Sequence, residues 1–298
     1  MAEGKSIRRE ETIPVLVQTK TVKEITHLYR TRHMSCLRDD QVWVSDDRGN
    51  LVLTDSNGNT LDKVSVDIFA DNGFHTVNDD GELLFTDEHH NVVNKVSVNK
   101  KIQVIIKTDK WAPISVFCSL ITGNVMVGLR RDEYRFTKDG KGKVELYSRT
   151  YKKLNTFKKD YQGYDLYGEP LYIIENFNGD ICVSDWKRKA VVVVGSNGRH
   201  KFSYSGHSSD PFFCPSGLCP DTHGRLVIYN SQMRTVHLID MNGNFLSILL
   251  NKLPVPEQFD FEALGPTGLC WDKKDNLWVG EYMEASVKIY HYQQNKTL

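Results

Sequence analysis

The segment His223-Gly224-Arg225-Leu226-Val227-Ile228-Tyr229-Asn230 decides the fold of this chain. It joins a glycine turn to a short apolar run, which is typical of a hairpin turn leading into a buried β-strand. Five other segments also join a turn to a short apolar run, at residues 39–46, 80–87, 122–127, 178–185 and 275–281. The chain therefore repeats one turn-and-strand unit six times.

The spacing of these units indicates the architecture. The intervals are 41, 42, 56, 45 and 51 residues when measured between Val44, Phe85, Val127, Val183, Ile228 and Val279. A strand-built repeat of about 40–50 residues is typical of propeller blades. Because a blade buries its faces only against neighbouring blades, six of them make one domain. We therefore predict an all-β fold, a six-bladed β-propeller of four-stranded antiparallel blades.

The segments around the repeats set the predicted domain limits. We expect a flexible N-terminus at residues 1–12, the propeller at 13–292 and a C-terminal tail at 293–298. The last blade stops after its third strand, so an N-terminal strand is expected to close the ring. The apolar residues 13–17 and 22–25 are the two candidates for that strand.

The composition of the chain indicates its cellular compartment and the kinds of partner that it binds. Lys+Arg and Asp+Glu both number 38, so the net charge gives no support for nucleic-acid binding in general. No membrane span and no secretory signal are expected. Four of the six cysteines occupy one slot of four blades, which predicts packing positions and free thiols. The positions are Cys36, Cys118, Cys219 and Cys270. We therefore expect a cytoplasmic protein.

Blades five and six carry a resemblance to a known family. Pro215-Ser216-Gly217-Leu218-Cys219, with the strands that follow it, resembles an NHL repeat, and Gly265-Pro266-Thr267-Gly268-Leu269 repeats its opening. The resemblance covers about residues 30 to 292, but blades one to three depart from the pattern. NHL repeats form six-bladed propellers that often end tripartite-motif (TRIM) ubiquitin-ligase chains in animals. The resemblance thus implies a non-catalytic module of the ubiquitin pathway that recognises a protein partner.

The loops between second and third strands gather cations on one face, together with an aromatic side chain. We predict that this face binds the ligand through Arg32, Arg48, His75, Arg130, Arg131, Arg135, Trp186, Lys187, Arg188 and Arg234. Such a surface suits single-stranded RNA, which remains an alternative to a protein partner. The simpler interpretation is a solvent-exposed loop face without a ligand. Nearby acidic residues would partly cancel its positive charge.

A second alternative is a calcium-dependent lactonase or hydrolase of the gluconolactonase-like propeller class. Such enzymes hold a cation with oxygen ligands from the starts of the inner strands. Here those starts carry Arg32 or His33, Asn72, Pro113, Pro170, Pro215-Ser216 and Pro266-Thr267. Only Asn72 is a good oxygen ligand, and an arginine opposes a divalent cation. The segment Asp87-Glu88-His89-His90 resembles a metal cluster but is interpreted as an exposed polar loop.

The sequence therefore favours a chain that is not an enzyme, with no catalytic residues, no cofactor and no metal. A protein partner is expected, RNA is the alternative, and neither DNA nor a membrane is expected as a partner. The chain is expected to be a monomer. Trp43 and Trp278 take matching strand positions and are predicted to pack between blades.

Overall fold

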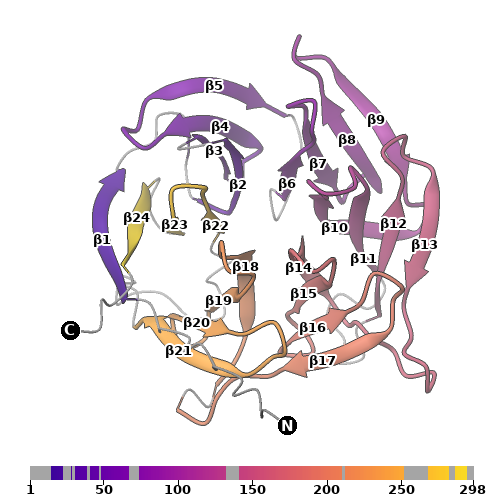
Figure 1. Ribbon diagram of the computed structural model, residues 1–298. Helices are drawn as coiled ribbons and strands as arrows, with labels where there is room; N and C mark the ends of the chain where they lie inside the picture. Colours follow the sequence, from indigo (N-terminus) through magenta and orange to yellow (C-terminus); the bar gives the residue numbers. More distant parts are fainter. Residues whose placement is uncertain are drawn as a thin grey trace, which may run out of the picture.

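The computed structural model describes residues 15–22, 28, 31–38, 41–46, 48–66, 74–131, 141–209, 212–251, 268–281 and 286–293. These residues form six four-stranded antiparallel sheets arranged in a ring (Figure 1). The prediction of a six-bladed propeller is confirmed. Within the described residues there is no helix that could cross a membrane. The predicted tails lie outside the described residues, apart from Gln293, so the domain limits remain a prediction.

Each of the first five blades is a continuous stretch of chain whose strands run from the ring centre outwards. Blade 1 is β2 (His33–Arg38), β3 (Gln41–Ser45), β4 (Asn50–Asp55) and β5 (Thr60–Ser65). Blade 2 is β6 (His75–Val77), β7 (Leu83–Asp87), β8 (Val92–Val96) and β9 (Ile102–Lys107). Blade 3 is β10 (Trp111–Cys118), β11 (Val125–Arg131), β12 (Gly142–Tyr147) and β13 (Lys153–Phe157).

The later blades follow the same order. Blade 4 is β14 (Pro170–Glu175), β15 (Ile181–Asp185), β16 (Ala190–Val194) and β17 (His200–Tyr204). Blade 5 is β18 (Pro215–Pro220), β19 (Leu226–Asn230), β20 (Thr235–Ile239) and β21 (Phe245–Leu250). Blade 6 is β22 (Leu269–Trp271), β23 (Asn276–Glu281), β24 (Ser286–Gln293) and, from the other end of the chain, β1 (Val15–Val22).

Strand β1 closes the ring, as predicted. It pairs antiparallel with β24, from Val15 opposite Gln293 to Val22 opposite Val287 (Figure 1). A register shift lies between Gln18 and Lys20. This strand begins within the first of the two candidate segments and ends at the start of the second. The outer edge of blade 6 is therefore covered by residues from the opposite end of the chain.

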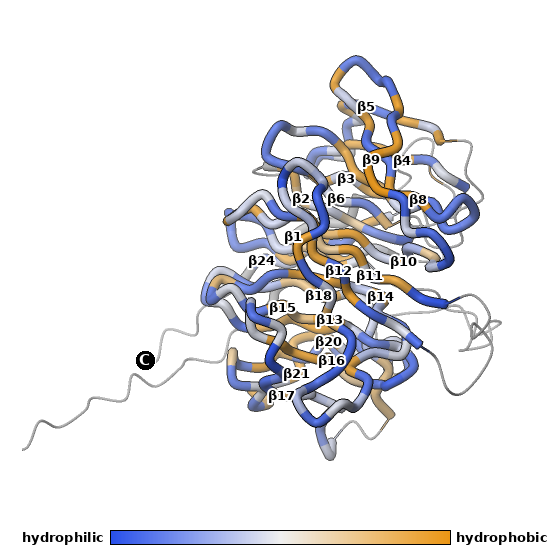
Figure 2. Tube along the Cα trace, turned by 90° about the vertical axis from the view of Figure 1, so that its right-hand side faces the viewer, coloured by the Kyte–Doolittle hydropathy of each residue, from blue (hydrophilic) through white to orange (hydrophobic). Residues whose placement is uncertain are grey.

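The core is divided among the seams between blades. Successive residues of a strand point to opposite sheet faces, so Leu226 and Ile228 pack against blade 4 whereas Val227 and Tyr229 pack against blade 6. Each of the six seams holds one apolar cluster of this kind. The second and third strands are covered on both faces, which explains their continuous apolar runs. Figure 2 shows these hydrophobic segments in the strands and hydrophilic residues at the turns.

The predicted packing positions are confirmed. Trp278 is fully buried at the seam of blades 6 and 1, and Trp43 is buried at the seam of blades 1 and 2. All six cysteines are free. The shared slot lies on the innermost strand of every blade, at Cys36, Thr76, Cys118, Ile174, Cys219 and Cys270.

Two residues at the end of second strands hold the segments that lead into the inner strands. The carboxylate of Asp185 accepts backbone N–H bonds from Gly168 and Glu169, just before β14, and from Arg188. Asn230 takes the same position in blade 5, where its side chain accepts from the Cys214 N–H. This polar position therefore fixes the path of the chain at the ring centre.

The two faces of the ring differ in the connections that they carry. The face called here the loop face carries the loops between second and third strands, such as 186–189 and 231–234. The opposite face, called the hairpin face, carries the turns between first and second strands and between third and fourth strands. Gly198 lies in the turn between the third and fourth strands of blade 4 and has a φ of 81°. A Cβ atom there would lie 2.4 Å from the Phe157 ring of blade 3.

Candidate functional site

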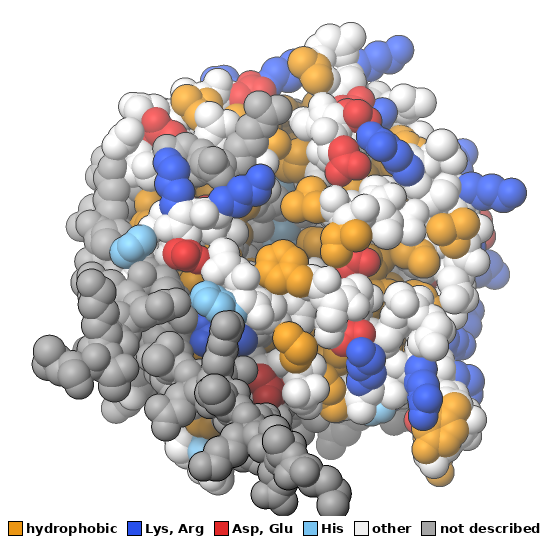
Figure 3. Space-filling view, viewed as in Figure 1, with side chains coloured by type: hydrophobic (Ala, Val, Ile, Leu, Met, Phe, Trp, Pro, Cys, Tyr) orange, Lys and Arg blue, Asp and Glu red, His pale blue; other side chains and the backbone are white. Residues whose placement is uncertain are grey.

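A channel runs along the ring axis between the six inner strands and opens on the hairpin face. Its cavity has a volume of about 300 Å³, at the small end of the range for ligand pockets. Apolar side chains line most of its wall, among them Met34, Val116, Ile174 and Leu218. Figure 3 shows the hollow at the centre of this face, with a histidine side chain in its depth.

Four packed rings close the channel towards the loop face. The His33 ring stacks on Tyr172, with centroids 5.0 Å apart, and meets Phe74 and His75 edge to face. Phe74 and Tyr172 also make an edge-to-face contact. All four side chains are buried. They come from blades 1, 2 and 4, so the closed end of the channel is held by elements far apart in sequence.

His33 is a buried imidazole at this closed end. It is 8% exposed, and among the residues that the structure describes its buried Nδ1 atom has no hydrogen-bond partner. Burial, and secondarily the neighbouring His75, lowers the pKa of His33 well below its ordinary 6.5. The imidazole is therefore neutral at neutral pH. A neutral imidazole with an unused nitrogen can accept a proton or a hydrogen bond from a ligand.

Three exposed apolar side chains rim the open end. Leu120 and Ile121 lie in the turn after β10, and Phe177 lies in the turn after β14. Their exposed fractions are 73%, 61% and 61%. Because large apolar side chains are normally withdrawn from water, such a rim suits an apolar ligand.

The thiols of the channel wall are not suited to nucleophilic catalysis. Burial raises the pKa of Cys118 to about 11 and raises the pKa of Cys219 and Cys270 well above their ordinary value. Since the thiolate is the nucleophile, these three thiols stay un-ionised at neutral pH and are not placed to attack a substrate.

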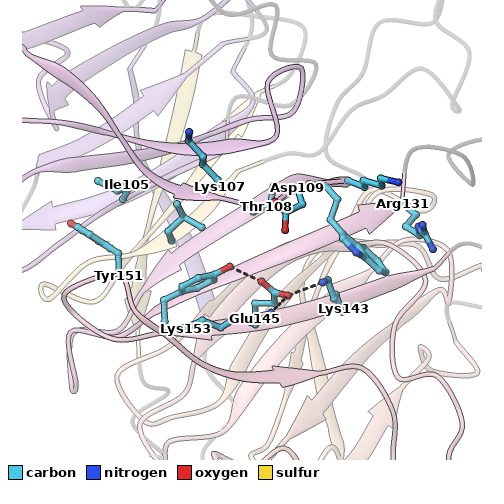
Figure 4. A pocket seen from close by; sticks show the side chains of 13 residues that line it. Ile105, Lys107, Thr108, Asp109, Arg131, Lys143, Glu145, Tyr151 and Lys153 are labelled. Carbon is cyan, nitrogen blue, oxygen red and sulfur yellow. Dashed lines mark hydrogen bonds and ion pairs between the residues drawn. The ribbon is translucent and has the colours of Figure 1, made fainter.

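A second concave site lies between blades 2 and 3 (Figure 4). This groove has a volume of about 580 Å³. At its floor Glu145 is buried and accepts hydrogen bonds from Lys143, Lys153 and Tyr147. These donors lower the pKa of Glu145 against the opposing effect of its burial, which is the largest single influence. The buried carboxylate therefore stays charged and holds two lysines in place.

The far end of this groove places cations around one indole. The Nζ atom of Lys143 lies 4.2 Å from the centroid of the Trp111 ring, and Arg131 and Lys158 lie within 6 Å of it. Such contacts are worth about 0.5–1 kcal/mol each when exposed. The groove therefore offers positive charge to a ligand, whereas the central channel offers an apolar wall.

Two of the predicted ligand-binding residues are buried. His75 is fully buried at the closed end of the channel, and its Nε2 atom lies 3.3 Å from the Trp43 carbonyl. Arg130 is 2% exposed and donates to Glu88 and Glu169. Both side chains are therefore withdrawn from the exposed loop face, and that either of them contacts a ligand stays a prediction.

The other predicted ligand-binding residues lie near the loop face. Arg48, Trp186 and Arg188 are exposed, and the Arg188 guanidinium donates to the Asp165 carbonyl. Those that are partly exposed are Arg32, Arg131, Lys187 and Arg234. Arg135 lies outside the described residues. That these side chains bind a ligand together remains a prediction.

The described residues do not fit a calcium site. Within them, no group of three His, Cys, Asp or Glu side chains is placed to hold a metal ion. The inner-strand starts present the rings of His33, His75 and Tyr172 to the channel rather than carboxylates, whereas calcium prefers oxygen ligands. Asn72 lies outside the described residues. In the predicted polar loop, the His90 ring forms a hydrogen bond with the Asp87 carboxylate, and the His89 ring packs edge to face on the His90 ring.

Sequence reasoning did not identify the closed end of the channel. His33 was considered only as a possible ligand at a strand start, and Phe74 was not singled out. The available signal was that both lie at the start of inner strands, His33 opposite Ser45 in β3 and Phe74 just before β6. Their inward direction depends on the register of each blade.

Comparisons with known proteins show which propellers this chain is similar to. No family model matches the chain, and no curated protein matches it. A gluconolactonase from Xanthomonas campestris matches with a TM-score of 0.67 and 12% identity over 94% of each chain. A virginiamycin B lyase from Staphylococcus aureus matches with a TM-score of 0.60 and 11% identity over 94% of this chain and 99% of that one. A streptogramin B lyase matches at 12% identity with a TM-score of 0.60, over 94% and 98%.

These matches establish the propeller fold and correct the functional expectation. The matched proteins named above are enzymes, and nothing in the comparisons supports an NHL or TRIM relationship, a role in the ubiquitin pathway or RNA binding. The expectations of a non-catalytic recognition module and of a chain that is not an enzyme are therefore wrong. The physical reason is that turns and buried strands of a blade follow from propeller geometry, which propellers of different function share.

Proposed function

We propose that this chain is an enzyme that opens a small, uncharged cyclic ester in the central channel, with His33 as the general base. The observation that carries the proposal is the unpartnered, neutral imidazole of His33 at the closed end of an apolar cavity. A buried polar group with no partner is uncommon in folded proteins and commonly marks a functional site.

The wall of the channel favours the substrate class. An apolar cavity of about 300 Å³ accommodates a compact uncharged molecule, because a charged one would lose its hydration without compensation. The fold similarity adds the reaction class, since one matched enzyme is a gluconolactonase, named for a lactone. A cyclic ester is uncharged before the reaction and carries a carboxylate after it. The apolar wall thus favours release of the product.

His33 has a defined task in this reaction. The neutral imidazole takes a proton from a water molecule as the water oxygen adds to the ester carbonyl carbon. The ring C–O bond then breaks, and the proton passes from the imidazolium to the leaving oxygen. In the virginiamycin B lyase, the variant in which one histidine is replaced by alanine is described as catalytically inactive. That protein therefore also needs a histidine, which supports a histidine-based reaction on this fold.

Release of acid from lactones in a weakly buffered solution tests the proposal. An aromatic lactone such as dihydrocoumarin and the polar gluconolactone serve as substrates, and His33→Gln is compared with wild type. His200→Gln is the matched control, because His200 is partly exposed and bonds Ser203 on an outer strand, away from the channel. We expect the aromatic lactone to be opened faster than the polar one, and His33→Gln to lower kcat by about 10² or more.

Mass spectrometry of the product separates hydrolysis from elimination. Hydrolysis adds one water to the substrate mass, whereas an elimination leaves the mass unchanged. No acceleration of any lactone by wild type would refute the proposal. So would hydrolysis that is unchanged in His33→Gln and depends wholly on added calcium.

A further inference from the structure

Two thiols meet across the seam at which the ring closes. Cys36 lies on β2 of blade 1 and Cys270 on β22 of blade 6, 234 positions apart in sequence. Their Sγ atoms are 2.6 Å apart, while both cysteines are free. Bonded sulfur atoms lie about 2.05 Å apart, so little movement separates this contact from a covalent bond. The side chains already point at each other from adjacent inner strands.

We propose that Cys36 and Cys270 form an oxidation site, at which a peroxide converts the two thiols into a disulfide that links blade 1 to blade 6. This modification is independent of the reaction proposed for His33. It concerns the integrity of the ring, because the link joins the first inner strand of the chain to the last.

The channel supplies access to this pair. Cys36 is partly exposed and both cysteines line the cavity, whereas Cys270 is buried. A small oxidant such as hydrogen peroxide fits a cavity of about 300 Å³. Cys36 is therefore the thiol that an oxidant reaches first, and Cys270 is the thiol placed to resolve it.

The chemistry balances with one peroxide for each bond. The Cys36 sulfur attacks one peroxide oxygen, the O–O bond breaks, and the products are a sulfenic acid on Cys36 and one water. The Cys270 thiol, which is un-ionised at neutral pH, passes its proton to the departing hydroxyl group while its sulfur attacks the Cys36 sulfur, and the hydroxyl group leaves as a second water. Two thiols are oxidised by two electrons, and the peroxide accepts both.

The neighbouring thiols have other surroundings. Cys118 and Cys182 direct their sulfur atoms towards the backbone carbonyls of Gly123 and Asp180. Cys219 lines the same channel on blade 5 and lies near enough to Cys270 to contribute to the raised pKa of that thiol. Cys219 is therefore the competitor that a test must distinguish from Cys270.

Peptide mapping after oxidation tests the proposal directly. Wild type, Cys36→Ser, Cys270→Ser, Cys219→Ser and the matched channel control Cys118→Ser are treated with hydrogen peroxide, alkylated in denaturant and digested without reductant. We expect a linked peptide pair containing Cys36 and Cys270 in wild type, Cys219→Ser and Cys118→Ser. This linked peptide pair should be absent from Cys36→Ser and Cys270→Ser. Circular dichroism before oxidation confirms that each variant is folded.

A thermal measurement supplies the second readout. Because the link closes a very long loop in the unfolded chain, it reduces the entropy gained on unfolding. We expect oxidised wild type to melt about 5 °C or more above the reduced protein, with no such shift in Cys36→Ser. A Cys36–Cys219 peptide in place of the proposed one would overturn the proposal. So would both thiols remaining fully alkylatable while peroxide oxidises other residues.

Discussion

The Nη1 atom of Arg130 donates to Oε1 of Glu169 across 2.6 Å, inside the protein rather than on its surface. Its Nη2 atom donates to Glu88 across 2.9 Å. The three side chains belong to blade 3, to the connection before β14 of blade 4 and to the loop after β7 of blade 2. One guanidinium therefore joins three consecutive blades near the loop face.

Replacing Arg130 by Met should destabilise the protein by about 3–5 kcal/mol, because two carboxylates close together in a largely buried site would lose the cation that they share. Urea denaturation monitored by tryptophan fluorescence measures the loss. Arg149→Met is the control: its pairs with Asp79 and Asp80 are exposed, so a change below about 1 kcal/mol is expected. Equal losses in the two variants would contradict the structural role of Arg130.

The stability should fall as the pH drops below about 6.5, through His33. Its folded-state pKa is lowered from the ordinary 6.5, so between these two values the unfolded chain binds a proton that the folded chain does not. Unfolding then takes up a proton, and the contribution of His33 to stability is complete above 6.5 and is lost at lower pH. Denaturation midpoints at about pH 7.5 and about pH 5.5 measure this loss. The loss should be smaller in His33→Gln, and an identical pH dependence would exclude His33 as its source.

Asp185→Ala should destabilise the protein by about 2–4 kcal/mol, because it leaves backbone N–H groups of Gly168, Glu169 and Arg188 without an acceptor. Asp240→Ala is the matched control. That carboxylate also accepts three hydrogen bonds, two from the backbone N–H groups of residues 242 and 244, but in an exposed turn where water replaces it. Thermal denaturation of the two variants compares a buried acceptor with an exposed one, and the prediction fails if Asp240→Ala is the more destabilised.

Removal of β1 should open the ring. A chain that begins after Val22 lacks the partner of β24, and an uncovered strand edge promotes association between molecules. We expect a lower melting temperature and a larger apparent mass in size-exclusion chromatography. A peptide of residues 15–22 should reverse both changes, whereas a peptide of scrambled order should not. A truncated chain that stays monomeric with an unchanged melting temperature would show that β1 is not needed for closure.

The sequence predicted the features of the fold that depend on the alternation of side chains along a single strand. The apolar runs located the second strands, and the cysteine slot lay on the inner strands as expected, because both follow from alternation along one strand. The burial of Arg130 was not predictable in this way. Its partners Glu88 and Glu169 lie 42 and 39 positions away, and only the packing of three blades brings them together.

The candidate site was missed for a related reason. The starts of several inner strands contain register shifts, as between Pro170 and Tyr172 and between Pro215 and Leu218. A shift of one residue turns a side chain to the opposite face. The direction of Tyr172 into the channel, against His33, could therefore not be deduced from spacing alone. The repeat pattern also could not predict the function of the protein, because it reflects only the geometry of the blades.

The pairing of β1 with β24 also determines how the protein responds to force. Val15 lies opposite Gln293 at one end of this pair of strands, so tension arriving through the two ends of the chain is applied to the same end of the ladder. The strand pairs would then separate one after another, in an unzipping geometry, instead of resisting together in shear. The strand that closes the ring would thus be the one that such tension peels away first, and a bond between Cys36 and Cys270 would leave that outer strand free to peel while keeping the inner strands joined.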